Sequence, residues 1–99
     1  QAYAAAFLHG KPRAELLSTH AEFAWRLLGD LRTAERDARA AVSTSPKDIE
    51  LRRRFLILLL QTDRLSQARD EILELRKLNR FGLFDELIDD METLLRRKQ

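Results

Sequence analysis

The feature that most constrains this chain is a repetition of residue types at a spacing of 34 positions. The matched pairs are Leu31 with Leu65, Ala34 with Ala68, Ala41 with Leu75, and Pro12 with Pro46. A period of this length is typical of helical hairpins that stack on one another, because a single hairpin cannot bury its apolar face alone. The sequence therefore predicts a repetitive helical protein.

The composition supports a helical chain and excludes several classes of function. Helix breakers are scarce, with 3 Gly and 2 Pro in 99 residues, which is typical of a nearly all-helical chain. The 18 basic and 16 acidic residues leave a net charge of only +2, so the charge does not favour a nucleic-acid partner. There is no cysteine, which excludes a disulfide framework, a thiolate metal site and a thiol nucleophile. The longest apolar run, residues 55–60, is far shorter than the roughly 18 residues of a membrane span.

Apolar spacing and turn signals predict where the helices lie. We expect helices over about residues 1–8, 13–28, 31–42, 47–61, 65–78 and 83–99, in line with the hairpin period. Asp30 follows a glycine and is well placed to cap the third of these helices. Ser45, Pro46 and Asp48 form a capping-box pattern, with Ser45 as the cap of the fourth helix.

The helix over residues 13–28 carries a wide apolar stripe. The residues of this stripe are Leu16, Leu17, Ala21, Ala24, Trp25 and Leu28. Alanines recur at helical spacing in the next helix, and small side chains let two helices approach closely. We therefore expect the two helices to pack together, with Trp25 as a core residue facing the alanines.

At these positions the chain resembles the tetratricopeptide repeat family, as a fragment of a longer chain. One repeat supplies Trp25, Gly29, Asp30, Leu31, Ala34, Ala38, Ala41 and Pro46, and the next supplies Phe55, Leu59, Leu65, Ala68, Ile72 and Leu75. The resemblance implies an all-α fold of antiparallel helical hairpins, stacked as a right-handed α-solenoid of about six helices. It divides a single domain, residues 1–99, into the second helix of a truncated repeat (1–12), two repeats (13–46 and 47–80) and a C-terminal capping helix (81–99).

The same resemblance implies a function. In this family the first helices of the repeats line a concave groove that binds a peptide or a partner helix. The matching positions here are Leu16, Thr19, Phe23, Arg26, Leu27, Glu50, Arg53, Ile57, Leu60 and Gln61. We therefore expect a non-catalytic protein-interaction scaffold in a larger assembly, such as secretion or envelope machinery. The lysines and asparagines with which some members clamp a chaperone's C-terminal carboxylate are absent, so we do not expect co-chaperone function.

Other classes of function find less support. Neither His9 nor His20 stands in a catalytic or metal-ligand spacing, so we expect no enzyme activity, small-molecule substrate, metal or cofactor. The last helix carries four acidic residues, Asp85, Glu86, Asp89 and Asp90. We interpret them as a solvated face rather than a cation site.

Two alternatives remain open. One is self-association through the N-terminal edge of the chain and the apolar residues of 84–95. The other is nucleic-acid binding through the basic residues Lys77, Arg80, Arg96, Arg97 and Lys98. The sequence does not indicate a cellular compartment.

Overall fold

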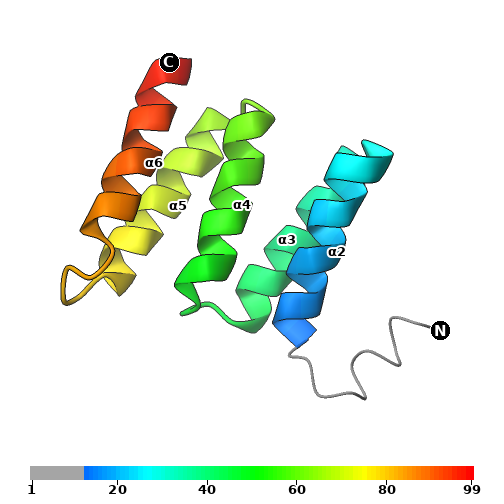
Figure 1. Ribbon diagram of the computed structural model, residues 1–99, viewed down its shortest axis with the longest axis horizontal. Helices are drawn as coiled ribbons and strands as arrows, with labels where there is room; N and C mark the ends of the chain where they lie inside the picture. Colours follow the sequence, from blue (N-terminus) through cyan, green and yellow to red (C-terminus); the bar gives the residue numbers. More distant parts are fainter. Residues whose placement is uncertain (1–12) are drawn as a thin grey trace. The chain divides into compact units, whose positions relative to one another are not determined.

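The computed structural model describes residues 13–99 and is all-α over that range, as the sequence predicts (Figure 1). Its five described helices are α2 (Arg13–Leu28), α3 (Leu31–Thr44), α4 (Ile49–Gln61), α5 (Leu65–Leu78) and α6 (Asp85–Lys98). The described residues contain no β-strand. The helix expected over residues 1–8 and the break before Pro12 lie outside the described residues.

The chain divides into two compact units, Gln1–Phe55 and Leu56–Gln99. The division falls within α4, so the first half of that helix belongs to unit 1 and the second half to unit 2. Each unit is described by itself below. The right-handed solenoid, the sixth helix, the single domain and the repeat boundaries stay predictions.

In unit 1, α2 and α3 form a hairpin around the turn that the sequence marks. Gly29 adopts a φ of 63°, a left-handed conformation that glycine tolerates without strain. The Asp30 carboxylate accepts hydrogen bonds from the Thr33 backbone N–H at 3.1 Å and from the Thr33 hydroxyl at 2.7 Å. These hydrogen bonds hold the pKa of Asp30 below its usual value. Asp30 is therefore the cap of α3, as predicted.

The start of α4 differs from the prediction. Asp48, and not Ser45, caps this helix, because its Oδ1 accepts from the backbone N–H groups of Glu50 at 3.0 Å and Leu51 at 3.2 Å. Ser45 instead ends α3, where its N–H donates to the carbonyl oxygen of Ala41. A tight turn between them closes with a hydrogen bond from the Asp48 N–H to the Ser45 carbonyl. The capping pattern located the boundary but assigned the wrong residue to it.

The core of unit 1 is built from small side chains. Ala14 of α2, Ala41 of α3 and Leu51 of α4 form one buried cluster, against which Leu17 packs. Ala21 and Ala24 on α2, and Ala34 and Ala38 on α3, are buried as well, and the two helices pack along one another. Trp25 is only half-buried, so the prediction that it is a core residue is wrong in part. Leu28 was also expected in the buried stripe, but its side chain is 63% exposed.

In unit 2, α5 packs against α6 through larger side chains. The buried apolar residues of these two helices are Ala68, Ile72, Leu75, Ile88, Met91 and Leu95. An ion pair joins Arg76 of α5 to Glu92 of α6 on the surface. In the connection between the helices, the Asn79 side chain accepts from the Phe84 N–H at 2.9 Å and donates to Asp85 at 2.6 Å. The connection is therefore an ordered loop.

Candidate protein-binding surface

The outer face of α2 carries most of the sequence-predicted binding residues of unit 1. These residues are Thr19, Phe23, Arg26 and Leu27. Successive members are four, three and one residue apart, so all four share one face of the helix. All four are exposed, and the apolar members strongly so: the exposed fraction is 47% for Phe23 and 71% for Leu27. The opposite face holds the buried alanines Ala21 and Ala24. All four residues are therefore accessible to a partner, and their role in a binding groove stays a prediction.

Leu16 behaves differently from its neighbours on this face. The sequence placed it in the binding surface, but its side chain is buried. A buried leucine offers no area to a partner, so its inclusion is wrong, and Leu16 belongs to the core of unit 1.

The first turns of α4 bring charged groups beside α2. Arg53 donates from Nε to Oε1 of Glu50 at 2.8 Å, and Arg54 donates from Nε to Oε2 of the same carboxylate at 3.1 Å. Arg54 also reaches the hydroxyl of Ser18 on α2 at 3.4 Å. Glu50 is thus held between two guanidinium groups, and one of these groups lies against α2.

The hydrogen bonds from Arg53 and Arg54 lower the pKa of Glu50, with the bond from Arg53 as the larger cause, although partial burial opposes the shift. The pKa of Arg53 is raised, mainly by its hydrogen bond to Glu50 and in smaller part by the charges of Glu50 and Glu22. Since Glu22 lies on α2, its negative charge is close enough to act on α4. The charges of the two helices are therefore coupled electrostatically.

This arrangement predicts an acid-sensitive contribution to stability. Because the pKa of Glu50 is lower in the folded protein than in the unfolded chain, acid favours unfolding. The stabilisation is complete above the ordinary glutamate pKa of 4.5 and is lost as the pH falls through the lower folded pKa. We expect Glu50→Gln to melt a few degrees below the native chain at neutral pH, and the difference to vanish in acid. Thermal unfolding by circular dichroism across that range checks this; a difference independent of pH would contradict it.

Two of the predicted groove residues, Arg26 and Arg53, carry guanidinium groups. Each is paired with a glutamate of its own helix, Arg26 with Glu22 at 3.2 Å and Arg53 with Glu50. Both pairs are partly solvated, and surface pairs of this kind are weak. A partner's carboxylate can therefore compete for either guanidinium group at little cost.

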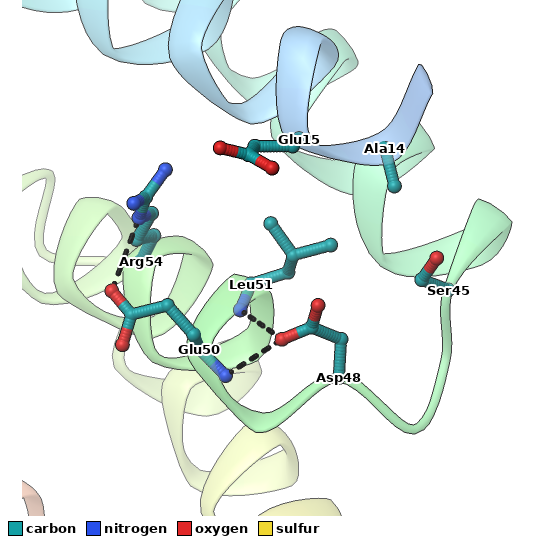
Figure 2. Close-up of a pocket in the computed structure, with 7 residues that line it drawn as sticks. All are labelled: Ala14, Glu15, Ser45, Asp48, Glu50, Leu51 and Arg54. Atoms are coloured by element: carbon teal, nitrogen blue, oxygen red, sulfur yellow. Dashed lines mark hydrogen bonds and ion pairs between the residues drawn. The ribbon is translucent and has the colours of Figure 1, made fainter. Parts of the chain in front are cut away.

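A pocket lies at the N-terminal ends of α2 and α4 (Figure 2). Its lining residues are Ala14, Glu15, Ser45, Asp48, Glu50, Leu51 and Arg54. The figure shows Asp48 bonded to the backbone of α4 and Glu50 bonded to Arg54, so these polar groups serve the local structure. Over residues 13–99 no group of three or more potential ligands could hold a metal ion.

The remaining predicted groove residues lie on the second half of α4, in unit 2. Gln61 is exposed and Ile57 is half-buried, whereas Leu60 is buried. Leu60 is thus a core residue, and placing it in the groove is wrong for the same reason as for Leu16. A groove that combines the residues of both units stays a prediction.

Sequence reasoning missed one polar contact inside unit 1. His20 of α2 binds the buried carboxylate of Asp37 on α3 through Nδ1, and Arg36 donates to the same carboxylate at 3.2 Å. The sequence held a signal for this contact: Asp37 is an acidic residue on the alanine-rich face of α3, where a buried charge needs a partner. This contact links the two helices of the hairpin.

Comparison with family models, curated proteins and solved structures finds no match for this chain. The tetratricopeptide resemblance therefore rests on the residues that carry it. Within residues 13–99, no helix combines the length and the apolar character that crossing a membrane requires.

Proposed function

We propose that this chain is a non-catalytic protein-binding module that holds a peptide or a helix of a partner protein against the outer face of α2. The observation that carries this proposal is the exposure of Phe23 and Leu27, which stand four residues apart on one face of a well-formed helix. Large apolar side chains exposed next to one another are unfavourable in water, and such patches mark interaction sites. Paired apolar anchors one turn apart suit an extended or helical segment.

The charged groups beside these anchors define the partner further. Arg26 is exposed on the same face, and Arg53 lies on the neighbouring α4, each in a weak pair that a stronger acceptor can replace. We therefore propose a partner segment with apolar side chains flanked by carboxylates. Following the resemblance, the binding surface extends along a right-handed tetratricopeptide-like solenoid to Ile57 and Gln61, and the protein works in a larger assembly, such as secretion or envelope machinery.

The proposal predicts that binding and folding separate at Phe23 and Leu27. We expect the double variant Phe23→Ala/Leu27→Ala to lose the partner, with at least a tenfold rise in the dissociation constant, because truncation removes both central anchors. Helicity and melting temperature should change little, since both side chains are exposed in the native chain. The measurement is retention of lysate proteins on the immobilised chain, followed by titration calorimetry with the retained protein.

Leu28→Ala is the matched control, because Leu28 is also strongly exposed on the same helix, at 63%, but is rotated by about 100° around the helix axis from Leu27 and further from Phe23. This variant should retain the partner. Arg26→Ala/Arg53→Ala tests the charged part of the surface and should weaken binding more at low salt than at high salt. Equal retention by the native chain and the Phe23→Ala/Leu27→Ala variant would disprove the proposed surface.

A further inference from the structure

The outer face of α3, in unit 1, carries positive charge and no exposed carboxylate. Arg32, Arg36 and Arg39 are exposed and follow at spacings of four and three residues, so they form one row along the helix. The other exposed residues of α3 are Ser43 and Thr44, and its buried alanines lie on the opposite side. We call the three arginines the arginine row.

A row of one sign differs from the other charged surface of unit 1. The helix α2 exposes Glu15 and Glu22 together with Arg13 and Arg26, so the two signs are mixed along it. Mixed signs are typical of a face that only contacts water. The arginine row instead keeps its positive charge, which attracts anionic groups.

The arginines are held only weakly by acidic residues of the same helix. Arg36 donates from Nε to Asp37 at 3.2 Å, yet its side chain is 71% exposed. Arg39 lies 3.7 Å from Glu35 with a side chain that is 52% exposed. Arg32 makes no hydrogen bond or ion pair among residues 13–99. Exposed pairs of this kind contribute little, so carboxylates from another molecule can compete for the row.

The arginine row already acts on one carboxylate of this chain. The pKa of Asp30 is lowered first by its hydrogen bonds with Thr33 and in smaller part by the charges of Arg36 and Arg32. Because the Asp30 carboxylate caps α3, it does not neutralise the row. Guanidinium groups bind carboxylates through two parallel hydrogen bonds, which makes arginine well suited to acidic side chains.

Two other anionic partners fit the arginine row less well. The helix α3 exposes no aromatic side chain on which a nucleic-acid base could stack. It exposes no large apolar side chain that could enter a membrane. The observations therefore favour an acidic segment of a protein.

We propose that the arginine row binds an acidic helix of a partner protein, whose carboxylates recur at the same spacings of four and three residues. The helical rise places successive arginines about 6 Å and about 4.5 Å apart along α3. Carboxylates on a helix that lies alongside α3 recur at the same intervals, so each meets one guanidinium group. This surface is separate from the α2 surface proposed above and does not depend on it.

The test is titration of the whole 99-residue chain at low salt with an alanine-based helical peptide that carries three glutamates at these spacings. The native chain should bind, and added salt should weaken binding. Arg32→Gln should raise the dissociation constant about two- to fivefold, the usual effect of one exposed ion pair. Arg32→Gln/Arg36→Gln should raise it further, with folding verified by circular dichroism. Arg32→Gln removes no contact within residues 13–99, so it decides the matter even if the double variant unfolds.

Arg69→Gln is the matched control, because Arg69 is exposed on α5, outside the arginine row, and its loss changes the net charge equally. This variant should bind as the native chain does. The proposal is overturned by a native chain that does not bind the peptide, or by equal losses in Arg32→Gln and Arg69→Gln. Equal binding of a peptide whose glutamates are spread around the helix overturns it too, as does tighter binding of a single-stranded oligonucleotide.

The outcome is independent of the α2 surface. Phe23 and Leu27 are native in every variant above, and Phe23→Ala/Leu27→Ala should bind the acidic peptide as the native chain does. Failure of the α2 surface therefore leaves this result unchanged, and the reverse holds as well.

Discussion

Leu75→Ala is expected to lower the free energy of unfolding by about 2–5 kcal/mol, the usual cost of emptying a buried leucine site. Leu75 is fully buried on α5, the helix that packs against α6 in unit 2. Truncation removes the transfer free energy of the lost methyl groups and leaves a cavity that a close-packed interior fills only in part. Urea denaturation followed by circular dichroism measures the loss.

Leu73→Ala is the control for this substitution, because it makes the same chemical change two residues away on a half-exposed position. We expect it to shift the free energy of unfolding by no more than about 0.5 kcal/mol. If Leu75→Ala and Leu73→Ala destabilised equally, the packing of α5 against α6 described here would be incorrect.

Ala41→Leu is expected to destabilise unit 1 by about 1–3 kcal/mol, or to prevent the hairpin of α2 and α3 from joining α4. Ala41 is fully buried in the cluster with Ala14 and Leu51, where a small side chain lets three helices meet. A leucine at this position must push the backbones apart or adopt a strained rotamer. The midpoint of urea denaturation measures the effect.

Ala40→Leu provides the comparison, because Ala40 is half-buried on the same helix and a leucine there can extend toward solvent. Leucine and alanine differ little in helix propensity, so any difference between the two variants reports packing alone. A Ala41→Leu variant as stable as Ala40→Leu would show that the cluster has free space.

Within residues 13–99, local sequence patterns predicted the secondary structure well. The helices and their turns were predictable, because apolar spacing of three and four residues defines a helix, and Gly29 followed by Asp30 supplies a left-handed residue and a cap. The cap of α4 was predicted to be Ser45, although Ser45 and Asp48 both offer a side-chain acceptor near the boundary. Only the path of the turn selects which of the two reaches the free N–H groups.

The candidate site was predictable in the same partial way. Helical spacing places Thr19, Phe23, Arg26 and Leu27 on one face, and the structure agrees that this face is exposed. The same spacing includes Leu16, which is buried. The pattern defines a face of a helix, but it does not say which part of that face a neighbouring element covers.

Sequence by itself thus determined that this protein is helical, where its described helices begin and end to within a few residues, and which side chains share a face. Tertiary structure decided that Leu28 is exposed, that Trp25 is half-buried, and that Asp37 finds His20 on another helix. The physical reason is range: helix formation and capping act between residues up to four apart. Burial and ion pairing depend instead on how distant segments approach, which local spacing does not encode.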